Sequence, residues 1–191
     1  DGEDRARETG FHGVVLDAPQ PRPDFTLRDT GGQPFRFRAE TAGTLTLLFF
    51  GYTNCPDVCP VHLANLSAVL DRFAYDVRSR VRVVFVTTDP ARDSPDKLRA
   101  WLDNFDPSFV GLTGTQAEVE AAQRAAGVAV AAIERDGTDD YTVAHASQLI
   151  AYSPDDFAYV AYPAGIRQVD WVHDLPRLLE PHGYLEAGGA P

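Results

Sequence analysis

The 191-residue sequence has no methionine and only two cysteines. A domain of this size does not depend on disulfide cross-links for stability, so the two thiols need another explanation. The longest apolar run, residues 44–50, is far too short to cross a bilayer. Acidic residues outnumber basic ones, and the formal net charge of −11 argues against nucleic acid or anionic lipid as a partner.

An initiator methionine and a basic-then-apolar leader are also missing, so we interpret the sequence as a processed or truncated chain. Residues 1–10 are charged and lack apolar spacing, which predicts a flexible linker. Residues 184–191 are expected to form a flexible tail. The remaining residues, 11–183, suit one compact domain, because 44% of the chain is hydrophobic.

The β-strand patterns are clear in five places. A turn-rich link at residues 28–34 separates "FTL" (25–27) from "FRF" (35–37) and predicts a β-hairpin. Continuous apolar runs at 44–50 and 81–88 predict buried strands. Residues 128–133 suggest a short strand, and residues 147–152 with 157–162 are typical of an antiparallel pair.

Four helices are expected between and after these strands. Helical apolar periodicity places them at residues 63–77, 94–105, 115–127 and 169–180. Ser94 is the expected N-cap of the second helix, with Pro95 at its first position. The order of elements predicts an α/β fold with a central mixed sheet and helices on both faces, which places the cysteines at the carboxyl end of a central strand.

Both cysteines lie in "GYTNCPDVCPVH", residues 51–62. A disulfide here would close a five-residue loop and stabilise the fold by only about 2 kcal/mol. Inert core thiols are also disfavoured, because Pro56, Asp57 and Pro60 are unusual in a core. A redox pair and a metal site remain open.

Pro60 is tolerated only in the first turn of a helix, so a helix is expected to begin at residues 57–59. Cys59 would then lie at the positive end of the helix, where the thiolate is favoured. Two thiols four residues apart across this turn can form a disulfide or bind one ion.

Two thiolates are too few for a structural zinc site but suffice for copper(I), and copper(II) is held better when a histidine joins them. Five histidines are available: His12, His62, His145, His173 and His182. His62 follows Cys59 by about one helical turn, and His145 precedes an apolar strand expected near the centre of the sheet. Spacing alone does not choose His145.

Four segments together carry a family resemblance. "FFGYTNCPDVCP", "VTTDPARDSPDKLRAWLDNF", "FVGLTG" and "YTVAHAS" occur in the order found in the Sco/SenC family of copper proteins, and the resemblance runs from about residue 11 to 179. It implies a thioredoxin-like fold with an extra N-terminal β-hairpin. It also implies copper, Cu(I) or Cu(II), bound by Cys55, Cys59 and His145.

Three other residues bear on this ligand set. Asn54 stands where the family often has histidine, although asparagine is not a usual copper ligand. Asp89 is expected at the end of the sheet near the thiols, where it contacts the site or a partner, or simply closes the turn before Pro90. His62 matches no functional position of the family.

Two other thiol-dependent classes fit the sequence less well. Thioredoxins have CxxC and a proline before the facing strand, whereas this chain has CxxxC and no proline in "VAHAS". Peroxiredoxins need Thr or Ser three residues before the reactive cysteine, and Tyr52 and Pro56 occupy those places.

The resemblance implies a copper metallochaperone, not a conventional enzyme, that assists assembly of the CuA centre in subunit II of cytochrome c oxidase. The alternatives are a thiol–disulfide oxidoreductase that uses Cys55 and Cys59 to reduce the acceptor's cysteines, and a redox or copper sensor. An upstream copper donor and a thiol reductant are expected partners. We expect an exported, extracytoplasmic monomer, anchored to the membrane through a segment absent from this sequence.

The acidic segment "ERDGTDDY", residues 134–141, precedes His145 and is expected to be mobile. If His145 moves away from the thiols, copper passes to the acceptor by ligand exchange. The net negative charge predicts an encounter that depends on salt.

Overall fold

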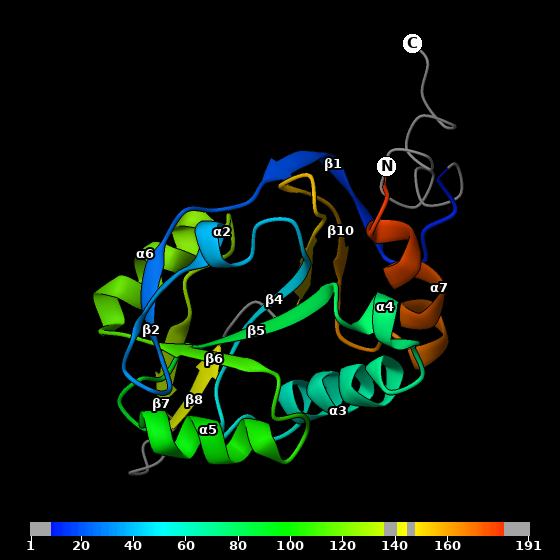
Figure 1. Ribbon diagram of the computed structural model, residues 1–191. Helices are drawn as coiled ribbons and strands as arrows, with labels where there is room; N and C mark the ends of the chain where they lie inside the picture. Colours follow the sequence, from blue (N-terminus) through cyan, green and yellow to red (C-terminus); the bar gives the residue numbers. More distant parts are fainter. Residues whose placement is uncertain (1–8, 136–140, 145–147, 182–191) are drawn as a thin grey trace.

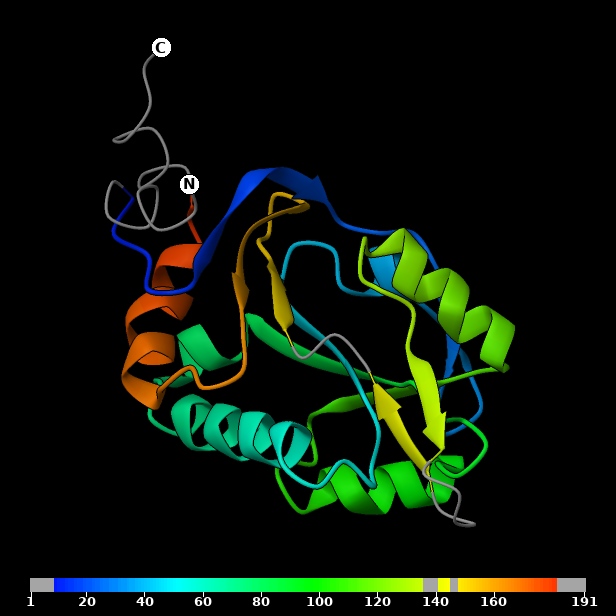
Figure 2. The same cartoon turned by 180° about the vertical axis from the view of Figure 1, so that it is seen from behind.

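The structure is a computed structural model that describes residues 9–135, 141–144 and 148–181 (Figure 1). An eight-stranded sheet in the order β1-β10-β9-β4-β5-β6-β2-β3 forms its centre. The main strands are Val14–Pro21 (β1), Thr26–Asp29 (β2), Pro34–Arg36 (β3), Leu45–Gly51 (β4), Val81–Thr87 (β5), Val110–Thr113 (β6), Leu149–Tyr152 (β9) and Phe157–Tyr162 (β10). Figure 2 shows the hairpin of Ala132–Arg135 (β7) and Tyr141–Ala144 (β8), which forms a separate two-stranded sheet.

Helices cover both faces of the sheet, which confirms the predicted α/β architecture. The helices are Phe37–Glu40 (α2), Val58–Leu70 (α3), Tyr75–Arg78 (α4), Pro95–Asp103 (α5), Gln116–Ala125 (α6) and Gln168–Leu178 (α7). One core cluster joins the sheet to α3, α5 and α7, and the second joins it to α2, α6 and the β2–β3 hairpin. The predicted N-terminal hairpin is therefore present, and it joins the sheet through antiparallel pairing of β2 with β6.

Strand β4 is the central strand, and all seven of its residues are buried. It pairs in parallel with β5 from Leu45↔Val81 to Gly51↔Thr87 and antiparallel with β9. Because β4 is covered on both faces, its sequence is continuously apolar rather than alternating. Parallel pairing brings the carboxyl ends of β4 and β5 to the same edge of the sheet.

The helix expected from 63 to 77 is two helices. Helix α3 ends at Leu70, and the short α4 begins at Tyr75. Phe73 and Val77 are partly buried and still pack against the same core cluster as α3. The apolar spacing therefore arises because α3 and α4 pack against the same core cluster, and not because they form one continuous helix.

The strand expected at 128–133 begins later, at Ala132. The buried side chain of Gln123 accounts for this shift. Its amide nitrogen donates to the carbonyl of Ala129 at 3.2 Å, and its oxygen accepts from the backbone N–H of Ala131 at 3.4 Å. The glutamine side chain thus takes up two backbone groups that a strand at this point would offer to a neighbouring strand.

Several expectations concern residues outside the described ranges. They include most of the linker, 1–8, the whole tail, 184–191, and the histidines His145 and His182. Among the helices that are described, none combines the length and the apolar character needed to cross a membrane.

Candidate metal and thiol site

The two cysteines follow the carboxyl end of β4, as the sequence predicts. Gly51 is the last residue of β4, and α3 begins at Val58. Cys59 is the second residue of α3 and is fully buried, whereas Cys55 in the preceding loop is partly exposed. The predicted start of the helix at residues 57–59 is confirmed.

A glycine is required at the end of β4. A β-carbon at Gly51 would lie 2.6 Å from the Sγ of Cys59 and 2.9 Å from the ring of Phe85. The carbonyl of Gly51 accepts hydrogen bonds from the backbone N–H and the hydroxyl of Thr88, at 2.7 and 3.1 Å. Gly51 therefore joins β4 to the end of β5 and gives the Cys59 thiol its place.

Both cysteines are present as thiols, and their side chains are close enough to hydrogen bond to one another. This hydrogen bond from Cys55, together with burial, raises the pKa of Cys59, although the backbone of Tyr52 opposes the shift. The sequence argument from the helix end favoured a thiolate at Cys59. The structure corrects it: burial and the neighbouring thiol favour the protonated form, because an isolated negative charge is poorly solvated there. A bound cation would reverse this preference.

A buried carboxylate anchors the cysteine loop from 40 residues away. Asp93, whose side chain is fully buried, accepts hydrogen bonds from the backbone N–H of Thr53 at 2.9 Å and from its hydroxyl at 2.5 Å. The hydroxyl of Thr87, at the end of β5, donates to the same carboxylate at 2.7 Å. The ammonium of Lys97 lies 3.4 Å away. These contacts fix the backbone two residues before Cys55.

Sequence reasoning missed Asp93 as part of this site. The available signal was a polar run, "TTDPARD", directly after a buried strand. The same network reaches Asn54, whose side-chain oxygen accepts a hydrogen bond from Lys97 at 3.0 Å. Asn54 thus has a contact that fixes the loop.

Asp89 also lies at this end of the sheet, buried after β5. Its carboxylate accepts a hydrogen bond from Arg92 at 2.5 Å, and its carbonyl accepts from the backbone of Arg92 and Asp93 at 3.1 and 2.9 Å. The guanidinium carbon of Arg92 lies 6.0 Å from the ring centroid of Tyr52. The contacts of Asp89 therefore close a turn and link that turn to the cysteine loop.

His62 is buried beside the core, with 4% of its surface exposed. Its ring packs edge-on against Phe49, with centroids 5.2 Å apart. It also lines a cavity of about 220 Å³ together with Asp57, Val61 and Ile166. These contacts give His62 a packing role in α3.

His145 lies outside the described residues. Strand β9, which begins at Leu149, is described. The pair Leu48↔Ile150 brings the start of β9 toward the carboxyl half of β4. The chain thus enters the sheet at the edge that carries the cysteine loop.

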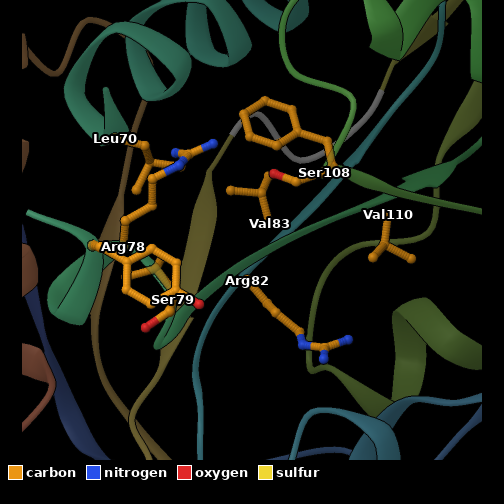
Figure 3. A pocket seen from close by; sticks show the side chains of 10 residues that line it. Leu70, Arg78, Ser79, Arg82, Val83, Ser108 and Val110 are labelled. Atoms are coloured by element: carbon orange, nitrogen blue, oxygen red, sulfur yellow. The ribbon is translucent and has the colours of Figure 1, made fainter. Parts of the chain in front are cut away.

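A separate cavity lies at the other end of the sheet (Figure 3). It measures about 380 Å³ and lies beside the amino-terminal ends of β5 and β6. Arg78 lines it and pairs with the buried carboxylate of Asp106. Neither cysteine is among its lining residues, so this cavity is separate from the thiol site.

Known proteins resemble this chain over most of its length. A model of the SCO1/SenC family matches residues 16–180. A protein of Stutzerimonas stutzeri, whose name marks it provisionally as copper-binding, is 37% identical over 145 residues, which are 74% of this chain and 69% of that protein. The mitochondrial SCO2 homologue of Mus musculus is 37% identical over 133 residues, or 69% of this chain. The chain spans 52% of that mouse protein and 65% of the bovine one.

Solved structures agree with this comparison. Apo Sco1 from Thermus thermophilus is 32% identical with a TM-score of 0.79, covering 88% of this chain and 97% of that one. Copper-bound ScoI from Bradyrhizobium japonicum is 31% identical with a TM-score of 0.74, covering 84% and 100%. BsSco, studied for a disulfide switch and described as a member of the Sco family of cytochrome c oxidase assembly proteins, shares the fold at 20% identity, 87% and 98% coverage and a TM-score of 0.66. The predicted thioredoxin-like fold is confirmed.

Proposed function

The chain belongs to the SCO1/SenC family, and on that basis we propose that it binds copper as cargo and delivers it during assembly of cytochrome c oxidase. The observation that carries this proposal is the pair of thiols, held within hydrogen-bonding reach of each other at the carboxyl end of the central strand. Two sulfur ligands so close together suit copper(I), which accepts few ligands and prefers soft ones.

The proposed ligands are Cys55, Cys59 and His145. Cys59 is held rigidly by Gly51 and the core, whereas Cys55 is partly exposed on the loop that Asp93 anchors. Since the pKa of Cys59 is raised, copper must displace a proton to bind there. His145 would join from the chain entering β9 and stabilise copper(II).

Transfer would begin when an acceptor thiolate replaces one of the two cysteines on the metal. The partly exposed Cys55 is the natural point of entry. The proposed acceptor is the CuA domain of cytochrome c oxidase subunit II. An upstream copper donor and a thiol reductant complete the scheme, since copper binds only the reduced pair. We propose that the protein acts as an extracytoplasmic monomer anchored to the membrane.

The same thiol geometry favours a second candidate function. Thiols within hydrogen-bonding reach can form a disulfide with little movement, so the pair could reduce the acceptor's cysteines and become oxidised itself. In that reaction the acceptor disulfide gains two electrons, and Cys55 and Cys59 lose them. Thiol exchange of this kind does not need His145, but copper(II) binding does. A redox or copper sensor would use the same pair.

The test is a copper(II) titration of the fully reduced protein, followed by visible absorption and EPR, with His145→Ala and His62→Ala in parallel. We expect a sulfur-to-copper charge-transfer band that saturates at about one thiolate-bound copper and is lost or shifted in His145→Ala only. Oxidation to the disulfide without retained copper would instead support the oxidoreductase. Damage confined to His62→Ala would refute the ligand set.

A further inference from the structure

A second group of metal-ligating side chains joins the start of the described chain to α7. His12, His173 and Asp174 each offer a ligand atom, and these atoms lie within 4.8 Å of one another. The two imidazole rings are stacked, with centroids 3.9 Å apart and planes 11° from parallel. These three residues share no element with the cysteine loop.

Each imidazole is oriented by its own carboxylate. The Nδ1 of His12 lies 2.9 Å from Asp170, and the Nδ1 of His173 lies 2.7 Å from Asp174. An ionised carboxylate only accepts, so each Nδ1 carries the proton and each neutral ring has its lone pair on Nε2. Among the described residues, neither Nε2 has a hydrogen-bond partner. Metal-binding histidines are usually held this way, by a carboxylate on the nitrogen that does not bind the metal.

The carboxylate of Asp174 is fully buried. It accepts hydrogen bonds from the backbone N–H groups of His12 and Gly13 at 3.0 and 2.9 Å, and from the hydroxyl of Tyr162 at 2.9 Å. Gly13 is required for this approach, because a β-carbon there would lie 2.4 Å from Val160. Asp174 therefore holds His12 beside α7 independently of any metal.

We propose that His12 and His173 bind one borderline divalent cation, such as Zn²⁺ or Cu²⁺, through their Nε2 atoms. Asp170 and Asp174 orient the rings, and water completes the coordination. Imidazole suits these cations, whereas copper(I) prefers the thiolates of the other site. Binding requires the stacked rings to tilt toward each other, and the His12 side chain, 41% exposed, has room to move. This proposal does not depend on the function proposed for the cysteines.

The test uses the full chain with Cys55→Ser and Cys59→Ser, which removes both thiols. Zn²⁺ is titrated by calorimetry, and the melting temperature is measured with Zn²⁺ and with EDTA. We expect one equivalent to bind and to raise the melting temperature, since a ligand that binds the folded state stabilises it. Adding His12→Gln or His173→Gln should weaken binding by at least tenfold.

His62→Gln in the same background is the matched control, because it removes an imidazole that is packed against Phe49. It should leave the Zn²⁺ equivalent in place. His12→Gln changes a half-exposed side chain, so its melting temperature in EDTA should stay close to that of its parent. EPR of Cu²⁺ in the parent should show nitrogen hyperfine structure that His12→Gln reduces. Unchanged Zn²⁺ affinity in both His12→Gln and His173→Gln would overturn the proposal, as would the absence of binding in the parent.

Discussion

The Sγ of Cys59 rests so close to Gly51 that a β-carbon on Gly51 would lie 2.6 Å from the sulfur. This contact joins the end of the central strand to the first turn of α3. The ring of Phe85 would lie 2.9 Å from the same β-carbon, so an added side chain would meet two neighbours at once. The position of the Cys59 thiol therefore depends on the absence of a side chain at Gly51.

We predict that Gly51→Ala displaces the Cys59 thiol. Overpacking of this kind typically costs about 1–3 kcal/mol of unfolding free energy. Urea denaturation measures this cost, and copper titration should show a weaker or shifted thiolate-to-copper band. Gly31→Ala is the control, because its β-carbon would meet only the Asp29 carboxylate, at 3.3 Å. A Gly51→Ala protein with wild-type stability and an unchanged copper spectrum would contradict the prediction.

A second prediction concerns Asp93. In Asp93→Asn one of the two accepting oxygens becomes an NH2 group, which donates but cannot accept, so either the backbone N–H or the hydroxyl of Thr53 loses its acceptor. A buried donor left unsatisfied costs about 1–3 kcal/mol, so stability should fall by that amount. Because Thr53 is two residues from Cys55, the copper spectrum should also change. Asp96→Asn, in the exposed first turn of α5, makes the same charge change and should alter neither property.

A third prediction concerns the contribution of the buried Arg22 to the stability of the fold. Its buried guanidinium donates to Asp156 at 2.8 Å and to the hydroxyls of Thr41 and Thr46 at 2.8 and 2.7 Å. A lysine ammonium cannot reproduce these directions, because it is a single point of charge on a flexible stem. Breaking a buried, hydrogen-bonded charge pair costs about 3–5 kcal/mol, and Arg22→Lys should approach the lower figure.

Arg38→Lys is the matched control for Arg22→Lys. Arg38 lies 3.8 Å from the same aspartate, Asp156, but its side chain is 51% exposed. Surface ion pairs are worth about 0–1 kcal/mol, so Arg38→Lys should be close to wild type in thermal and urea unfolding. Equal losses in the two variants would show that the buried network is not the source of the stability.

Acid stability should depend on Asp170. Hydrogen bonding from Arg167 lowers the pKa of Asp170 to about 2, with a further contribution from His12, while burial opposes the shift. Because this pKa is below the value of about 3.9 expected in the unfolded chain, the carboxylate stabilises the fold at pH above about 4. This stability is lost as the pH falls toward 2.

The measurement is the melting temperature at intervals between pH 5 and pH 2. Wild type should lose more stability between pH 4 and pH 2 than Asp170→Asn, which has no carboxylate to protonate at this position. Asp96→Asn controls for the loss of one negative charge and should follow the wild-type curve. Parallel curves for wild type and Asp170→Asn would rule out this contribution.

The elements that formed as expected are those with strong local signals. The continuous apolar run at 44–50 became the central strand, and Ser94 with Pro95 marked the start of α5. The expected strand at 128–133 was displaced because Gln123, several residues earlier in the chain, satisfies that backbone. Strands β1, β6 and β8 were not among the expected elements.

By itself, the sequence determined that two thiols follow a buried strand and begin a helix, because apolar periodicity and the fixed geometry of Pro60 act over a few residues. Only the tertiary structure decided that Cys59 is fully buried against Gly51, that Asp93 holds Thr53 across 40 positions, and that His12 stacks on His173. Such contacts have no periodic pattern in the sequence, because they form only when segments distant in the chain pack together in the fold. The same burial reversed the expected preference of Cys59 for its thiolate form, because the environment of a side chain is a property of the whole fold.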